Sequence, residues 1–468
     1  MPGTLDLDAA LQYVRAHRDR HLQELREFLG IASVSAISSH AGDVRQAAQW
    51  LKHRLLSAGF STVRVEETGG HPVVVATNPG HPDRPTVLVY GHYDVQPVDP
   101  LPAWRHPPFE PAIVDGALYA RGASDDKGQV FMHVIAAEAW LRTGNELPVN
   151  LIFLLEGEEE IGSPHLGNYI ASRQDLLRAD LAVISDTPMY AEGVPAICYG
   201  LRGLAALELT VAGPKQDLHS GIFGGTVANP AHALATLIAS LHDADQRVAV
   251  AGFYDDVDLP TPAERHAFAQ LPFDDTAYQD EVGVPELAGE PGFSPLERTW
   301  IRPTVEVNGL WSGFSGEGQK TIIPASAHAK LTCRLVPHQD PVRVLDLLEA
   351  HLRAHCPKGV ALTIARGEGA PGTVTPIDHP AVRSAEQAIR AVYGRPAAFI
   401  RMGGSIPVVV TLHDVLAMPT LLLGFALPNE NFHAPNEHFH LDNFHRGAET
   451  VVRLWSLLAG WKREEGSQ

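Results

Sequence analysis

A short apolar run that ends in polar, chemically active side chains constrains this chain most. Residues 87–90, Val-Leu-Val-Tyr, are bounded by turn residues and predict a buried strand of a parallel sheet. His92 and Asp94 follow at once. Because residues two positions apart in an extended backbone point to the same face, the imidazole and the carboxylate should project together. The strand is therefore expected to end in a functional site, and the plain alternative is a histidine paired with a neighbouring carboxylate.

Clusters of acids or histidine lie in loops that follow the strands of an alternating strand and helix pattern. There are five: His92 with Asp94, Asp125 with Asp126, Glu158 to Glu160, Asp186, and His433. The carboxyl ends of strands are where open α/β sheets bind their ligands. Converging carboxylates raise one another's pKa unless a cation lies among them. The pattern therefore favours a metal site over a set of solvated loops.

The alternating pattern is interrupted in the middle of the chain. A chain of 468 residues is too long for one ordinary core, so two domains are expected. We predict an α/β catalytic domain formed by residues 1–200 and 378–468, with a small α+β domain inserted at residues 201–377. Within the insert, the acidic and proline-rich residues 244–300 should form surface loops and short helices. The apolar spacing at the N-terminus predicts one helix over residues 8–30.

Charge and cysteine usage exclude several classes of protein. The net charge of -19 argues against a nucleic-acid surface, which would need clusters of Lys and Arg. The three cysteines lack CxxC spacing, so neither a disulfide framework nor a thiolate zinc site is expected. The sequence has no stretch of about 18 apolar residues and no apolar segment after a basic start. A cytoplasmic protein without a membrane span is expected.

Several motifs carry a family resemblance. Five of them, in order, resemble the co-catalytic dinuclear metallopeptidases: GHYDVQP at 91–97, YARGASDDKG at 119–128, EGEEEIGS at 156–163, ISD at 184–186 and HAPNE at 433–437. That family groups aminoacylases, glutamate carboxypeptidases, succinyl-diaminopimelate desuccinylases and carnosinase-type dipeptidases. Four more resemble its cytosolic non-specific dipeptidase and carnosinase branch: LHSG at 218–221, KTIIP at 320–324, CRLVP at 333–337 and GGSIP at 403–407. The resemblance implies a zinc-exopeptidase-like three-layer α/β domain with an inserted ferredoxin-like α+β lid and dimerisation domain.

The resemblance also implies the ligands of two divalent metal ions. His92 and Asp186 would hold one ion, while Glu160 and His433 would hold the other. Asp125 would bridge the two, and the peptide bond that follows it would be cis. Imidazoles together with carboxylates suit zinc or manganese. A hydroxide between the two ions would attack the substrate carbonyl.

Three further residues are assigned catalytic roles by the resemblance. Glu159 would be the general base that takes a proton from the attacking water and later passes it to the leaving amine. Asp94 would orient His92 and fix its tautomer. His219 would reach into the cleft of a partner subunit and stabilise the oxyanion, which implies a homodimer formed through the inserted domain. The alternative for His219 is a helix-capping or loop histidine.

Residues of the selective motifs point to a substrate with a free carboxyl end. The planar guanidinium of Arg334 could hold such a carboxylate in two parallel hydrogen bonds, with Ser405 and Thr321 adding donors. His379 also matches a position of the dipeptidase branch. The prediction is hydrolysis of dipeptides or small peptides. One alternative is an N-acyl amino acid deacylase, and the other is a metal-binding or peptide-binding protein without turnover.

Overall fold

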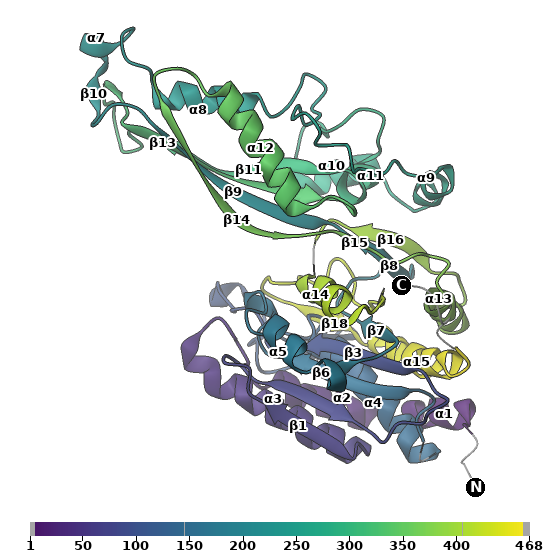
Figure 1. The fold of residues 1–468 in the computed structure, drawn as a ribbon. Helices are drawn as coiled ribbons and strands as arrows, with labels where there is room; N and C mark the ends of the chain where they lie inside the picture. Colours follow the sequence, from purple (N-terminus) through teal and green to yellow (C-terminus); the bar gives the residue numbers. More distant parts are fainter. Residues whose placement is uncertain (1–4, 145, 405, 462–468) are drawn as a thin grey trace. The chain divides into compact units, whose positions relative to one another are not determined.

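The computed structural model describes residues 5–144, 146–404 and 406–461. The chain forms two compact units (Figure 1). Unit 1 consists of Met1–Tyr199, Thr375–Ile400 and Pro407–Gln468, and unit 2 consists of Gly200–Val374 and Arg401–Ile406. The predicted single insert at residues 201–377 omits the short segment Arg401–Ile406, which also belongs to unit 2.

Unit 1 is built on a mixed sheet in the order β1, β2, β6, β3, β7, β17, β8, with β16 also paired to β8. The strands are β1 (Thr62–Glu66), β2 (Val73–Thr77), β3 (Thr86–His92), β6 (Asn150–Glu156), β7 (Leu181–Ile184), β8 (Ala196–Leu201), β16 (Ala398–Met402) and β17 (Thr420–Leu422). The central strands β6, β3, β7 and β17 are parallel, and β1, β2 and β8 pair antiparallel. The predicted parallel core is therefore present, with antiparallel strands toward its edges.

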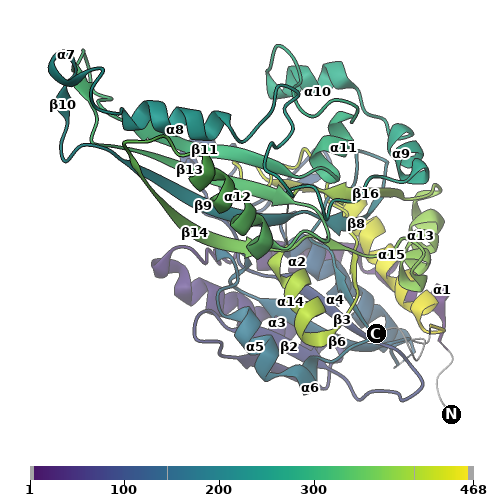
Figure 2. The ribbon, with the colours of Figure 1, turned by 45° about the horizontal axis from the view of Figure 1, so that its top comes forward.

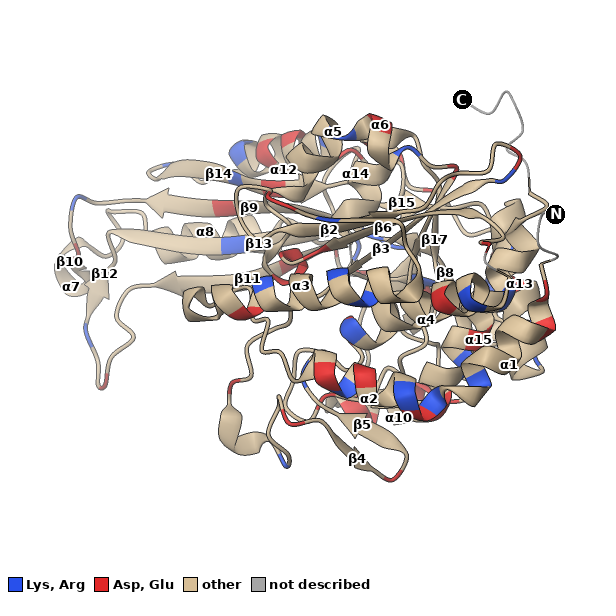
Figure 3. Cartoon of the chain, turned by 90° about the horizontal axis from the view of Figure 1, so that it is seen from below, with Lys and Arg blue, Asp and Glu red and all other residues tan. Residues whose placement is uncertain are grey.

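Helices cover both faces of this sheet, as Figure 3 shows from below. Val87 and Val89 of β3 belong to one core with residues of α3 (Ala41–Ala58), α4 (Lys127–Thr143), α13 (Pro380–Tyr393) and α15 (Leu441–Leu458). The opposite face carries α5 (Leu166–Ser172), α6 (Gln174–Leu177) and α14 (Pro407–Leu416). Leu88 and Tyr90 are as buried as the two valines. Burial on both faces explains why β3 is a continuous apolar run, and the three-layer α/β prediction is confirmed.

The N-terminal segment forms two helices instead of the single helix predicted over residues 8–30. They are α1 (Leu7–Ala16) and α2 (Arg18–Leu29). His17 between them has φ -112° and ψ 18°, and its Nδ1 hydrogen-bonds to the carbonyl of Tyr13 at 2.8 Å. A side chain that bonds to a backbone carbonyl competes with the helical ladder. The apolar spacing continues through this break, which is why the sequence pattern missed it.

Unit 2 contains an antiparallel sheet in the order β11, β13, β9, β14. Its strands are β9 (Gly203–Ala212), β11 (Thr304–Ser312), β13 (Ser326–Leu335) and β14 (Ala361–Ala370), and its larger helices are α8 (Pro230–Ala239) and α12 (Pro341–His355). Alternate residues of β9 pack with both helices in one core. Figure 2 shows the two helices on the same side of the sheet. This is the small α+β unit that the sequence predicted.

Shorter elements complete both units. The proline-rich part of unit 2 forms the short helices α9 (Pro262–Ala269), α10 (Asp275–Val282) and α11 (Pro295–Trp300), as predicted. The strands β10 (Leu218–His219) and β12 (Ile322–Ile323) pair beside α7 (Ser220–Phe223). In unit 1, β4 (Ala112–Val114), β5 (Ala117–Tyr119) and β18 (His438–His440) form a small sheet. No helix within the described residues has the length and apolarity needed to cross a membrane.

Candidate metal centre

Three neighbouring strands deliver most of the candidate ligands to one edge of the sheet. β3 lies between β6 and β7 and pairs parallel with both. His92 is the last residue of β3, and Asp186 comes two residues after β7. Glu159 and Glu160 begin the short 3-10 helix η3 (Glu159–Ile161) just after β6. Parallel strands place their carboxyl ends side by side, so these side chains converge although they are far apart in the sequence.

The loop between β5 and α4 carries Asp125 to the same place. Gly122 in this loop has φ +83°, a left-handed conformation that favours glycine. A Cβ at Gly122 would also lie 2.6 Å from Cγ1 of Val95. The peptide bond between Asp125 and Asp126 is cis, as expected from the resemblance.

The carboxylate of Asp125 lies between two histidines. Its Oδ1 is 3.1 Å from Nε2 of His92, and its Oδ2 is 2.9 Å from Nε2 of His433. Nε2 of His433 is also 3.2 Å from Oε2 of Glu160. On the other side, Oδ2 of Asp186 is 4.0 Å from Nε2 of His92. Ligand atoms of His92, Asp125 and Glu160 all lie within 4.8 Å of one another. The structure therefore brings the five predicted ligands into one cluster.

Protonation of the imidazoles balances some of the negative charge of this cluster. Hydrogen bonds to Asp125 and Glu160 raise the pKa of His433 to about 10. Burial lowers the pKa of His92, but hydrogen bonds to Asp125 and Asp94 raise it above its ordinary value overall. Divalent cations would take the place of these protons, since metal binding requires neutral imidazole. Imidazole nitrogen and carboxylate oxygen are donors that zinc and manganese accept, so the donor set fits such ions.

Asp94 is fully buried and holds the segment that begins η3. Its Oδ1 accepts the N–H of Glu159 at 3.2 Å, and its Oδ2 accepts the N–H of Glu160 at 3.1 Å. Nδ1 of His92 is 3.1 Å from the main-chain oxygen of Asp94 and 3.4 Å from its Oδ1. The family resemblance implies that the carboxylate of Asp94 orients His92. In the structure, the main-chain carbonyl is the nearer partner of His92, and the carboxylate also anchors the two glutamates.

Glu159 has the environment of a proton carrier. Burial raises the pKa of Glu159 to about 7, and the negative charges of Glu160 and Asp125 add to the rise. A carboxyl group with a pKa near neutrality can both take and give a proton at physiological pH. Glu160, next to it, accepts a hydrogen bond from Nε2 of Gln96 at 2.7 Å, which fixes one of its oxygens.

Several side chains that support the cluster have no role assigned to them from the sequence. Gln96 is one, although it lies in the same motif as His92. Glu158, for which the motifs required no acid, is buried and accepts the N–H of His71 at 3.0 Å and bonds to Nδ1 of His165 at 2.9 Å. Their presence inside the motifs was the only available signal, because a single sequence does not show side-chain partners.

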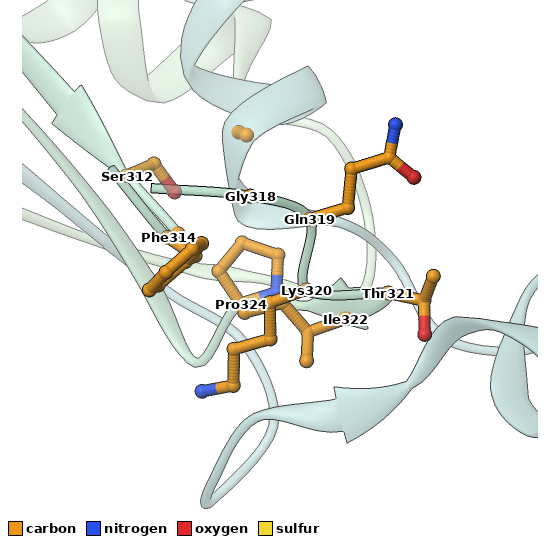
Figure 4. Close-up of a pocket in the computed structure, with 10 residues that line it drawn as sticks. Ser312, Phe314, Gly318, Gln319, Lys320, Thr321, Ile322 and Pro324 are labelled. Atoms are coloured by element: carbon orange, nitrogen blue, oxygen red, sulfur yellow. The ribbon is translucent and has the colours of Figure 1, made fainter. Parts of the chain in front are cut away.

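Two other predicted residues lie together in unit 2. β10 and β12 pair His219 with Ile322, and the N–H of Ser220 bonds to the carbonyl of Thr321 at 3.0 Å. Nδ1 of His219 accepts the N–H of Gly221 at 3.0 Å and so caps α7, as the plainer alternative proposed. Thr321 borders an open pocket of about 460 Å³, and Figure 4 shows it on the same segment as Lys320 and Ile322.

Arg334 lies on β13 of unit 2 and is half-buried. Within the described residues, no carboxylate forms an ion pair with it. Arg202 lies near Arg334. Burial lowers the pKa of Arg202 to about 10, and the positive charge of Arg334 adds to this lowering. Two guanidinium groups near each other make this part of unit 2 favourable for an anion. Ser405, the predicted neighbour, lies outside the described residues.

His379 stands apart from the metal cluster. It is the residue before α13, and its Nδ1 accepts the N–H of Ala381 at 3.2 Å as a helix cap. Its ring meets that of Trp461 edge-on, with 5.7 Å between centroids. No contact within the described residues joins it to the five candidate ligands.

A comparison with models of protein families identifies the family of this chain. The model of Peptidase family M20/M25/M40 matches residues 88–457, which include all five candidate ligands. The chain belongs to this peptidase family. The resemblance inferred from the motifs is therefore confirmed, and so is the prediction of a peptidase.

Similar proteins cover nearly the whole chain. The Cys-Gly metallodipeptidase dug1 of Schizosaccharomyces pombe is 30% identical over 459 residues, covering 95% of this chain and 96% of that protein. The human Beta-Ala-His dipeptidase is 30% identical and covers 92% of this chain and 88% of its own. The structure of the M20 family metallo-carboxypeptidase Sso-CP2 of Sulfolobus solfataricus is 34% identical, with a TM-score of 0.82, and covers 94% of this chain and 99% of its own.

Proposed function

We propose that this protein is a metal-dependent dipeptidase that hydrolyses dipeptides or small peptides with a free carboxyl terminus. One observation carries the proposal: each oxygen of the partly buried Asp125 carboxylate faces a different histidine, His92 on one side and His433 on the other. A carboxylate in this position is suited to ligate two cations at once. A lone structural ion pair would need only one of the two histidines.

The proposed centre holds two divalent ions, either Zn²⁺ or Mn²⁺. Asp125 would ligate both ions. His92 with Asp186 would complete one site, and Glu160 with His433 would complete the other. Such ions polarise a substrate carbonyl and lower the pKa of bound water. The donor set does not distinguish zinc from manganese, because both accept imidazole together with carboxylate.

In the proposed reaction, residues of the chain position the substrate and move protons. Glu159 takes the proton of the attacking water on a carboxylate oxygen and passes it to the leaving amine. Nδ1 of His219 accepts a backbone N–H, so its neutral imidazole carries the proton on Nε2. That N–H is the group that would donate to the oxyanion in the cleft of the partner subunit. Arg334, with the positive charge of Arg202 nearby, would bind the substrate carboxylate, with Thr321 and Ser405 adding donors.

The similar proteins decide between the alternatives that the sequence left open. Relatives named as metallodipeptidases match at 30% identity over most of both chains, which confirms the dipeptidase prediction in preference to the N-acyl amino acid deacylase. Membership of a peptidase family likewise disfavours a binding protein without turnover. His379 would add to substrate binding only as an outer residue, because its contacts are a helix cap at Ala381 and the ring of Trp461.

The proposal includes a homodimer formed through unit 2. β11 is an edge strand of its sheet, and it exposes apolar side chains. Leu310 is 59% exposed and Trp311 is 50% exposed, with Phe314 just beyond the strand at 48%. An apolar edge strand is a surface that another chain can pair with or cover. A cytoplasmic location stays a prediction from the sequence.

A substrate panel tests the proposed activity. Protein stripped with a chelator and reloaded with Zn²⁺ or Mn²⁺ is offered dipeptides, the same dipeptides with an amidated carboxyl end, and acetylated amino acids. The proposal predicts turnover of the dipeptides and at least about tenfold lower kcat/KM for the amidated forms, because a charge-assisted pair to Arg334 is lost. Turnover of the acetylated amino acids alone would overturn it.

A further inference from the structure

Glu437 is a fully buried carboxylate whose hydrogen bonds all go to one loop. Its Oε2 accepts Nη1 of Arg121 at 2.8 Å and the N–H of Gly122 at 2.9 Å. Its Oε1 accepts the N–H and the hydroxyl of Ser124 at 3.0 and 3.2 Å, and the N–H of Asp125 at 3.1 Å. Five donors therefore converge on two oxygens, and every donor belongs to the segment that ends at Asp125.

This arrangement requires an ionised carboxylate at position 437. An ionised carboxylate only accepts hydrogen bonds, and each of its oxygens can take more than one. Arg121 is 1% exposed, so the pair is out of water and its partners cannot be replaced by solvent. An amide in place of Glu437 would direct its N–H groups at other donors in either orientation. It would face Arg121 and Gly122 one way, and Ser124 and Asp125 the other.

The chain near Glu437 also carries His433. Only three residues separate the two, and the main-chain oxygen of Glu437 accepts the N–H of Ala120 at 3.1 Å. The segment from Glu430 to His440, which contains both residues, is closed by a contact between its ends. Oε1 of Glu430 accepts the N–H of His440 at 2.8 Å and lies 2.7 Å from its Nδ1. The loop that presents His433 and the loop that presents Asp125 are therefore joined through Glu437. His433 and Asp125, whose side chains are 2.9 Å apart, are the residues that these two loops present to each other.

We propose that Glu437 is a positioning residue of the metal centre, which fixes the backbone of Asp125 and sets it against His433. This inference rests on the proposed function, in which Asp125 ligates both ions. Because five donors of the chain already occupy its two oxygens, Glu437 would act without ligating an ion or binding the substrate. It acts through the main-chain N–H of Asp125, so its loss displaces one ligand that both metal sites share.

Titration of Co²⁺ into the metal-free full-length protein tests this role. Visible absorption of bound Co²⁺ reports both the number of ions and their coordination geometry. The inference predicts that Glu437→Gln binds both ions about 10- to 100-fold more weakly than the wild type, the range found when a residue behind a metal ligand is replaced. It also predicts an altered Co²⁺ spectrum and, with saturating metal, a lower kcat with little change in KM.

Glu138→Gln is the matched control. Glu138 is a buried carboxylate on α4 that accepts hydrogen bonds from Arg20 and Arg54, and no hydrogen bond or ion pair within the described residues joins it to the loop at 121–125. Both variants should unfold at a lower temperature without metal, but only Glu437→Gln should change metal affinity and spectrum. If Glu437→Gln binds Co²⁺ like the wild type while its melting temperature falls as in the control, the role is merely structural and the inference is overturned. If the wild type itself does not bind two ions, the proposed dinuclear metal centre is overturned, and with it the role of Glu437.

Discussion

The carboxylate of Asp94 accepts the main-chain N–H of Glu159 at 3.2 Å, and its second oxygen accepts that of Glu160. One buried side chain thus fixes the proposed base and a proposed metal ligand. We predict that Asp94→Asn lowers kcat/KM by about 10- to 100-fold, because the amide group would face an N–H donor. Steady-state kinetics at saturating metal measure this. Unchanged kinetics in a variant that binds both ions would show that the hydrogen bonds of Asp94 to Glu159 and Glu160 are dispensable.

Glu159→Gln removes the proposed proton carrier and keeps its shape. Loss of a general base costs about 10²- to 10⁴-fold in rate. We predict that kcat falls by this amount while the number of bound ions stays at that of the wild type. Turnover of a dipeptide, together with metal analysis of the same sample, checks both statements. Full activity in this variant would remove Glu159 from the mechanism.

A buried histidine should make the protein sensitive to acid. His133 on α4 is 1% exposed, and burial lowers its pKa from 6.5 to about 3. Between these pH values the unfolded chain binds a proton that the folded chain excludes. The contribution of His133 to stability is therefore fully present above pH 6.5 and is lost as the pH falls toward 3, with a slope of about 1.4 kcal/mol per pH unit.

The measurement compares the wild type with His133→Gln, both free of metal. Urea unfolding at several pH values from 6 to 4 gives the two slopes. The variant should lose stability with falling pH less steeply than the wild type, whatever its stability at neutral pH. Parallel curves would show that His133 does not carry this acid sensitivity.

A charged residue on the exposed edge strand should separate the proposed dimer. We predict that Leu310→Asp halves the molecular mass seen by light scattering after size-exclusion chromatography, because a buried unpaired charge strongly disfavours an apolar contact. Leu259→Asp is the control: Leu259 is 70% exposed and lies in the proline-rich part of unit 2. A dimer that survives the first substitution, or is lost equally in the control, would place the interface elsewhere.

The order and type of the main elements could be predicted because burial dictates their residue patterns. β3 and β6 are apolar runs since both faces of their sheet are covered, and β9 alternates since only one face is. The break at His17 could not be predicted, because it depends on one side chain bonding to the carbonyl of Tyr13 without any change in apolar spacing. The short helix α14 was also missed.

The candidate ligands were predictable for a different reason. They follow strands, and the topology of parallel strands brings them together. The residues behind them were not predictable, since Gln96, Glu158 and Glu437 are recognisable only by their partners. Apart from His165, which follows Glu158 by seven residues, these partners are distant in the sequence, and no spacing in one chain reveals them. Asp94 shows the same limit: its position was identified, but its bonds to Glu159 and Glu160 were not.

Anomalous diffraction data, collected at the absorption edge of the metal from a crystal grown with Zn²⁺ or Mn²⁺, would locate the ions themselves. We predict two adjacent peaks, about 3.5–4 Å apart, with Asp125 between them. His92 and Asp186 should bind one ion, and Glu160 and His433 the other. A single peak, or peaks bound by other residues at saturating metal, would contradict it.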